Sequence, residues 1–172
     1  MRIPLPIETR RLILRAFDPA EDAQAMTAVY CDPEVMRLIP GGPLGGHSAV
    51  RAELARHTAG QLERGFAFWA IVERAGNRVI GDVGFGIFAE TGDVELGYTL
   101  ARDVWGHGYG TEAAEACLAA GFEHLEVTRI VAVIDEENEP SKRVAARIGM
   151  TLETRMHAHG RPHLLFARGR DG

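Results

Sequence analysis

The sequence predicts a mixed α/β protein whose sheet begins with antiparallel strands and contains a strand–helix–strand crossover in its second half. Two observations carry this prediction. Three strand-like segments follow one another with short turns between them, and an alanine-rich helical segment then separates two further apolar strands. Short turns join antiparallel strands, whereas parallel strands need a longer crossover.

The first half of the chain is predicted to open with a strand. Residues 11–17 (RLILRAF) alternate apolar and polar side chains, which is typical of a half-buried strand. Helices are predicted after it, over residues 20–30 and 48–64. Glu21 and Asp22 fall in the first turn of the earlier helix, where the helix dipole favours negative charge.

Three strands are then predicted close together, over residues 66–73, 78–88 and 93–100. Apolar and β-branched side chains dominate each segment, and turn residues separate them. Because the connections are so short, we expect all three strands to be antiparallel.

The pattern changes in the second half of the chain. Residues 110–125 are predicted as a helix, residues 129–135 as a β-branched strand, and residues 140–148 as a short helix that ends at a glycine. Closing strands are expected over residues 151–157 and 163–168. This order predicts the crossover of the mixed sheet.

Length and charge limit the classes of function. The 172 residues suit one compact domain over residues 1–172. No apolar run approaches the roughly 20 residues that cross a bilayer, and the N-terminal segment lacks the apolar stretch of a signal peptide. The formal net charge is −5, whereas duplex binding draws its affinity from phosphate neutralisation. We therefore expect a cytoplasmic protein with no membrane partner and no direct nucleic-acid partner.

The most informative segment is a turn with alternating glycines, Gly106, Gly108 and Gly110, directly before the alanine-rich helix. Glycine allows positive φ and close approach of the backbone, and unpaired N–H groups at a helix start form an anion cradle. A P-loop needs a lysine that is not present, and a dinucleotide fingerprint needs glycine where Thr111 stands. The remaining alternatives are a phosphate site and a turn without a ligand.

This segment resembles the coenzyme A pyrophosphate loop of the GNAT N-acetyltransferases, whose pattern is Gln/Arg-x-x-Gly-x-Gly/Ala. Trp105 stands at the first position of the pattern, and Gly108 and Gly110 match the glycines. Tryptophan at that position, within WGHGYGTEA, is similar to the RimJ/RimL branch of the family.

Further motifs of the same branch follow in the same order, so that the resemblance covers about residues 7–168. It implies a GNAT-like fold with splayed central strands, one acetyltransferase domain and acetyl-CoA as co-substrate. The motifs are residues 8–15 (ETRRLILR), 32–36 (DPEVM), 94–98 (VELGY), Asn138 with Ser141, and residues 148–150 (IGM).

The resemblance also implies a place for each part of CoA. The diphosphate is expected on the N–H groups of residues 106–111, and the pantetheine arm along Tyr98–Leu100. Asn138 matches an asparagine that contacts this arm, although a helix N-cap is the alternative. Lys142 or Arg143 is expected to pair with CoA phosphates, or to be a solvated charge. The candidate cofactor residues are Leu100, Trp105, Gly106, His107, Gly108, Tyr109, Gly110, Thr111, Asn138 and Arg143.

The implied reaction is direct attack of a neutral primary amine on the thioester. Glu95 is the candidate base: it lies between Val94 and Leu96, its side chain faces away from theirs, and partial burial would raise its pKa toward neutrality. An exposed partner for an arginine is the alternative. Ser141 is a candidate acid for the departing thiolate or only a helix cap, and Tyr98 is a second candidate acid or a packing residue.

The sequence thus predicts an acetyl-CoA-dependent N-acetyltransferase that acts on a primary amine, either a protein N-terminus or a small molecule. The rival hypothesis is a non-catalytic acyl-CoA-binding module that keeps the loop but lacks base chemistry. No metal is expected, because Cys31 and Cys117 lie far apart and the histidines show no zinc-ligand spacing. The oligomeric state stays open, with a homodimer among the alternatives.

Overall fold

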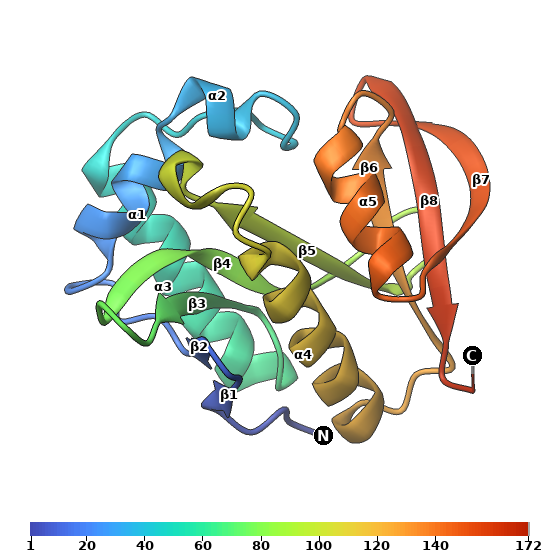
Figure 1. Cartoon of the computed structure of the whole chain (residues 1–172), viewed down its shortest axis with the longest axis horizontal. Coiled ribbons are helices and arrows are strands. Elements are labelled where there is room, and N and C mark those ends of the chain that lie inside the picture. The colour runs from blue at the N-terminus through green and yellow to red at the C-terminus, as the bar shows by residue number, and fades with distance from the viewer. Residues whose placement is uncertain (172) are drawn as a thin grey trace.

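The structure, a computed structural model, describes residues 1–171. Its centre is an eight-stranded sheet of order β1-β2-β3-β4-β5-β6-β8-β7 (Figure 1), which confirms the predicted mixed α/β class. The strands are β1 (Ile7–Glu8), β2 (Leu12–Arg15), β3 (Phe68–Glu73), β4 (Arg78–Ile87), β5 (Val94–Leu100), β6 (Arg129–Asp135), β7 (Thr151–Ala158) and β8 (Arg161–Gly169).

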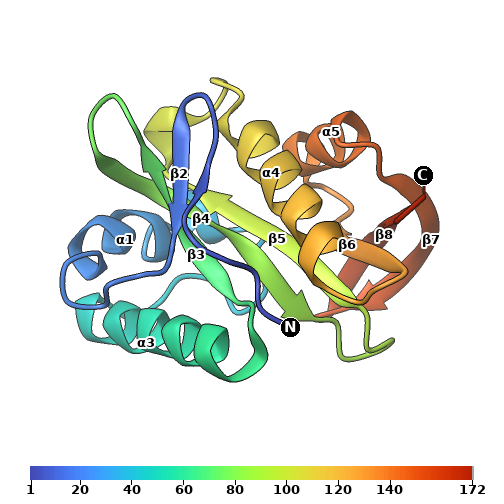
Figure 2. The ribbon, with the colours of Figure 1, turned by 90° about the horizontal axis from the view of Figure 1, so that it is seen from below.

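Helices cover both faces of the sheet. The helices α1 and α3 lie on one face and α4 and α5 on the other (Figures 1 and 2). Each face has its own buried apolar cluster. None of the helices in residues 1–171 combines the length and apolar character needed to cross a membrane. The helices are α1 (Ala23–Tyr30), α2 (Pro33–Met36), α3 (His47–Arg64), the 3-10 helix η1 (Arg102–Val104), α4 (Tyr109–His124) and α5 (Glu139–Arg147).

Strand pairing determines where the sheet opens. Strands β3, β4 and β5 are antiparallel as predicted, and α4 carries the chain across to β6, which is parallel to β5. The β4–β5 ladder runs the whole length of β5, whereas β5 and β6 pair only at Glu95 and Val131. The C-terminal half of β5 therefore has no strand partner on its β6 side, and the two central strands splay.

The prediction for the first helix was wrong at its start. Helix α1 begins at Ala23 rather than near residue 20. Asp22 precedes it, and its carboxylate accepts two hydrogen bonds from the Arg15 guanidinium, at 2.7 and 2.8 Å. Asp22 therefore anchors the chain to β2, and neither it nor Glu21 lies in the first helical turn.

The sequence did not predict three short elements, β1, α2 and η1. Helix α2 starts at Pro33, a residue that suits the first helical position because it has no N–H to satisfy. The side chain of Asp32 caps it by accepting from the N–H groups of Glu34 and Val35, at 2.8 and 3.4 Å. This cap fixes the helix beside the open end of β5.

Candidate active site

The segment between η1 and α4 presents free backbone amides. Gly106 and Gly108 have φ of 80° and 79°, a region that favours glycine. Gly108 is the N-cap of α4, and the first α4 amide with a backbone acceptor is that of Glu112, which donates to the Gly108 carbonyl at 3.1 Å. Within residues 1–171, no hydrogen-bond acceptor pairs with the N–H groups of residues 106–111. Such a row of amides at a helix start binds anions.

Hydrogen bonds of Arg11 and Glu112 support this loop. The Glu112 carboxylate accepts from the Thr9 hydroxyl at 2.6 Å, and from Arg11 through its backbone N–H at 2.8 Å and its Nε at 2.6 Å. Arg11 Nη1 also donates to the carbonyl oxygen of His107 at 2.8 Å, and its guanidinium lies 4.5 Å from the centre of the Tyr109 ring. The guanidinium therefore draws a loop carbonyl away from the free amides.

The Glu112 carboxylate is held in its charged form. Burial acts to raise its pKa, but the hydrogen bonds from Thr9 and Arg11 outweigh burial and lower the pKa below its ordinary value. The Glu112 carboxylate therefore stays ionised at neutral pH, and its hydrogen bonds link the segment between β1 and β2 to the first turn of α4.

Side chains of the loop serve mainly to fix its shape. The Trp105 indole N–H donates to the Leu100 carbonyl at 2.9 Å, and the Tyr109 hydroxyl donates to Glu73 Oε1 at 2.6 Å. The His107 ring stacks on Tyr109, with 6.0 Å between ring centres. These contacts leave the backbone amides, rather than the side chains, as the ligand-facing groups.

A cavity of about 490 Å³ lies beside these amides. Its walls are the loop before α4, the end of β5, α2 with the segment that follows it, and α5. All predicted cofactor residues except His107 line it: Leu100, Trp105, Gly106, Gly108, Tyr109, Gly110, Thr111, Asn138 and Arg143. The structure thus gathers residues from β5, the loop and α5 around one space.

A second cavity, of about 310 Å³, adjoins the first. Glu95, Phe68 and His159 line it, together with apolar side chains of β6 and α5. Tyr98 and Ser141 line both cavities, so they lie where the two spaces meet. A thioester in one cavity and an amine in the other would meet at this point.

Glu95 faces the second cavity, and its neighbours Val94 and Leu96 are buried in the core, as the sequence predicted. Burial raises the pKa of Glu95 to about 7 against the lowering effect of the hydrogen bond from the Val133 backbone N–H, and the charge of Glu90 adds a smaller raising contribution. Both protonation states are therefore populated at neutral pH, as a general base requires.

Tyr98, Ser141 and Asn138 form a chain of hydrogen bonds between the cavities. The Tyr98 hydroxyl donates to Ser141 Oγ at 3.1 Å, and the Ser141 N–H donates to Asn138 Oδ1 at 3.2 Å. Asn138 is thus the N-cap of α5, the alternative that its sequence position allowed. Burial raises the pKa of Tyr98, so its hydroxyl stays protonated at neutral pH.

Sequence reasoning missed the support of the loop. Thr9 and Arg11 lie in the N-terminal motif and Glu112 follows the glycines, but nothing in either motif alone shows that they touch. Arg147, which lines the larger cavity, was also not selected. Among residues 1–171, no group of three or more His, Cys, Asp or Glu side chains is placed to hold a metal ion.

Splayed parallel strands beside an amide-lined loop define an acyltransferase class of site, and the comparisons with known proteins agree. A family profile described as an acetyltransferase (GNAT) domain matches residues 11–151. The chain therefore belongs to the GNAT acetyltransferase family and is an N-acetyltransferase.

The similarity to known proteins extends over most of the chain. An uncharacterized N-acetyltransferase, p20 of Bacillus licheniformis, is 34% identical over 146 residues, which are 84% of this chain and 82% of that protein. A GNAT-family acetyltransferase of Bacillus anthracis superposes with a TM-score of 0.86 at 25% identity, covering 98% of this chain and all of that one. A ribosomal-protein-S5-alanine acetyltransferase of Vibrio fischeri shares the fold, with a TM-score of 0.78 at 19% identity over 98% of each chain.

Proposed function

We propose that this chain is an acetyl-CoA-dependent N-acetyltransferase of RimJ/RimL type that transfers the acetyl group directly to a primary amine. The observation that carries the proposal is the pair of joined cavities. Free amides line one cavity, a carboxylate with a raised pKa lines the other, and Tyr98 and Ser141 lie between them. One domain over about residues 7–168 supplies every one of these groups.

The residues present fit CoA. The N–H groups of residues 106–111 suit a diphosphate, because they are free and lie at the positive end of α4. The pantetheine arm is assigned to Tyr98–Leu100, where β5 lacks a strand partner and its outward polar groups are available. Asn138 is assigned a contact with the same arm, because it lines both cavities.

The chemical step uses the groups where the cavities meet. The amine nitrogen attacks the thioester carbon, and Glu95 takes a proton from the nitrogen. A backbone N–H near Tyr98–Leu100 stabilises the oxyanion. When the carbon–sulfur bond breaks, the thiolate takes a proton from Ser141, and Tyr98 replaces that proton through their 3.1 Å hydrogen bond. Tyr98 then regains a proton from water and Glu95 releases one to water, which restores both groups.

The acceptor that suits this base is a weakly basic amine. An α-amine with a pKa of about 7.8 must lose its proton at a cost of about 1 kcal/mol at pH 7, whereas a lysine side chain at about 10.4 costs about 4.6 kcal/mol. Glu95, with a pKa of about 7, is matched to the first case. We therefore assign a peptide N-terminus or a small-molecule amine of similar basicity as acceptor, in preference to lysine.

Thiol release from acetyl-CoA with a panel of acceptors tests the proposal. The panel contains peptides with a free N-terminus, peptides of the same sequence with an acetylated N-terminus and one lysine, and small amines. We expect release with free N-termini or weakly basic amines and little with lysine. CoA at a hundredfold excess over its Kd should add about 2.7 kcal/mol of stability. Stabilisation by CoA without release on any amine would contradict the proposal and favour an acyl-CoA-binding module.

A further inference from the structure

One wall of the second cavity is an aromatic ring that packs against two glycines. Phe68 begins β3 and is only partly buried, whereas the next four residues of the strand are buried. A Cβ at Gly97 would come within 3.0 Å of the Phe68 ring, and one at Gly86 within 3.8 Å. At Gly97 even one added carbon would press on the ring, so glycine leaves the space that the ring fills. Phe68 lines the cavity, which accounts for its partial exposure.

The ring lies on the same face of the sheet as Glu95. Gly86 pairs with Glu95 across β4 and β5, and Gly97 follows Glu95 by two residues. Residues opposite each other on neighbouring strands, and residues two apart on one strand, share a face of the sheet. Both glycines under the ring are therefore neighbours of Glu95. An amine that reaches the Glu95 carboxylate brings the substituent on its adjacent carbon to this ring.

The aromatic surface continues away from β3 and carries no charge. The centre of the His57 ring, on α3, lies 5.3 Å from that of Phe68 and 6.0 Å from that of Phe17. Burial, helped by the positive charges of Arg56 and Arg64, lowers the pKa of His57 to about 4. The His57 ring is therefore neutral at pH 7, and Phe68 stays in apolar surroundings.

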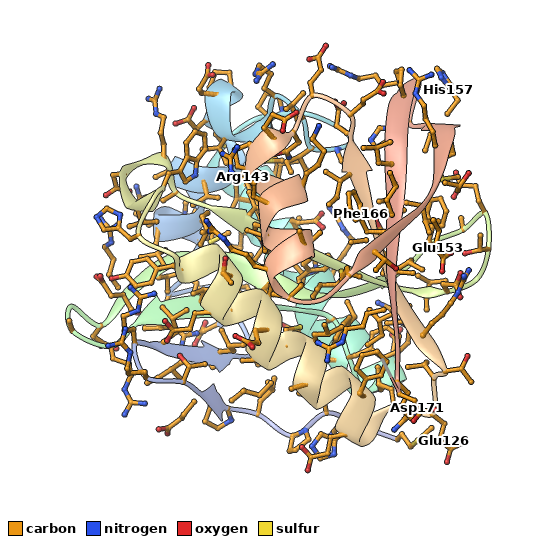
Figure 3. All side chains as sticks on the ribbon, turned by 45° about the vertical axis from the view of Figure 1, so that its right-hand side comes forward. Glu126, Arg143, Glu153, His157, Phe166 and Asp171 are labelled. Carbon is orange, nitrogen blue, oxygen red and sulfur yellow. The ribbon has the colours of Figure 1, made fainter. Side chains whose placement is uncertain are left out.

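The charged groups of the second cavity disfavour an anionic acceptor. Within residues 1–171, neither lysine nor arginine lines it, and its one basic side chain is His159. This histidine lies in the β7–β8 hairpin, just after His157, which Figure 3 labels. Of the two acidic side chains in the lining, Asp135 is already paired with Arg161 at 2.8 Å, and the other is Glu95. A carboxylate next to the amine would lie near Glu95, and like charges repel.

We infer that the acceptor is a primary amine whose adjacent carbon carries an uncharged apolar group, and that Phe68 selects this group by packing against it. The inference rests on the proposed transfer to an amine beside Glu95. It narrows the acceptors of suitable basicity to one chemical class, which includes peptides with an apolar first residue and small amines of the same kind.

Thiol release from acetyl-CoA with peptides that differ only in their first residue tests the inference. Leucine and asparagine have similar shapes, while asparagine and aspartate differ in charge, so these three separate polarity from charge. We expect kcat/KM for the leucine peptide to exceed that for the asparagine peptide at least about tenfold, as for an apolar group in a hydrophobic pocket. The aspartate peptide should be the poorest. Leucinamide and asparaginamide repeat the comparison and distinguish a small amine from a peptide.

Phe68→Ala should lower the leucine-to-asparagine ratio of kcat/KM about tenfold, and Phe68→Leu should give a ratio between. This ratio is independent of the concentration of folded enzyme, so it stays meaningful if a variant is partly unfolded. The Kd for CoA should not change, because Phe68 does not line the first cavity. Phe122→Ala, at a partly buried residue of α4 that lines neither cavity, is the matched control and should keep the ratio.

The outcomes separate the inference from the proposed function. Equal kcat/KM values across the peptides and across the amides, or a preference for aspartate, overturn the inference and leave the acetyltransferase proposal intact. A leucine preference that survives in F68A, or that is lost equally in F122A, overturns the role of Phe68. Absence of thiol release with every amine tested overturns the proposed function and the inference with it.

Discussion

The loop before α4 and the second cavity flank the same splayed strands, but they are built from different groups. The first cavity is lined by the loop of residues 106–111, whose backbone N–H groups are free and are directed by two positive φ angles. The second cavity is lined by side chains, chiefly those of Glu95 and Phe68. A site made of backbone groups at positive φ requires glycine, so it can be recognised in the sequence. A site made of side chains depends on burial, which only the fold creates.

A second carboxylate shows how burial alone fails to make a base. Asp82 lies on β4, its pKa is raised to about 6 by burial, and the Tyr30 hydroxyl donates to it. Unlike Glu95, it lines neither of the two cavities. Access to a cavity, and not the raised pKa by itself, therefore makes Glu95 the candidate base.

The largest expected effect is on the rate, from Glu95→Gln. Removal of a general base lowers kcat by about 10²–10⁴-fold, while the Kd for CoA should stay unchanged because Glu95 lies in the other cavity. Steady-state kinetics and CoA titration measure the two effects. Asp82→Asn is the matched control and should retain most of the activity. An E95Q enzyme with full kcat removes Glu95 as base.

The same variant should change how stability depends on pH. The folded pKa of Glu95 is about 7 and its ordinary value 4.5, so the ionised side chain opposes folding. Below pH 4.5 Glu95 is protonated in both the folded and the unfolded state, so it has no effect on stability. As the pH rises from 4.5 to 7, the unfolding free energy of the wild type falls by up to about 3 kcal/mol relative to that of E95Q. Urea unfolding at pH 5 and pH 8 checks this. A stability difference that is the same at both pH values contradicts the burial of a titrating Glu95.

Gly108→Val should weaken CoA binding about tenfold or more, since a β-branched residue at φ of 79° costs at least about 1–2 kcal/mol and shifts the loop. A Cβ at Gly108 would also come within 3.4 Å of Arg11 Nη2, whereas one at Gly106 meets nothing within 4 Å. Gly106→Val has the same strain without this contact. We expect G108V to reduce CoA affinity more than G106V, as measured by calorimetry; equal losses would show that the Arg11 contact is unimportant.

Glu112→Gln gives the smallest expected effect, a loss of about 1–2 kcal/mol in unfolding free energy together with weaker CoA binding, because the partly buried Arg11 loses its charged partner. Arg74→Ala, which removes an exposed ion pair with Glu8, is the control and should cost less than about 1 kcal/mol. Urea unfolding and the Kd for CoA measure both. A loss of stability without any change in Kd would limit Glu112 to a structural role.

The sequence made the central strands and the crossover predictable, because their apolar patterns and short turns are local features. The start of α1 was not predictable, since Asp22 accepts hydrogen bonds from Arg15 on β2 and does not lie in the first turn of the helix. Strand β1 has only two residues, too few for a pattern. These elements escaped prediction because they are very short or because a side-chain contact, rather than an apolar pattern, sets their boundary.

The candidate site likewise divides into features that a local sequence pattern predicts and features that depend on the fold. The free amides lie where the glycines predicted them, and the roles assigned to Glu95, Ser141 and Tyr98 stay predictions with a compatible geometry. The bond between Tyr98 and Ser141 joins residues on β5 and α5, and no local pattern encodes it. The same holds for Arg147, which becomes a candidate only once its cavity is known.

The contact between Arg11 and Glu112 spans 101 positions of the chain. Contacts of such long range form late, because closing a long stretch of chain costs entropy before the contact is gained. The glycine turn can therefore reach its final shape only after the segment between β1 and β2 has met the first turn of α4. In a refolding time course, the ability to bind CoA should appear in the last kinetic phase, after most secondary structure has already formed.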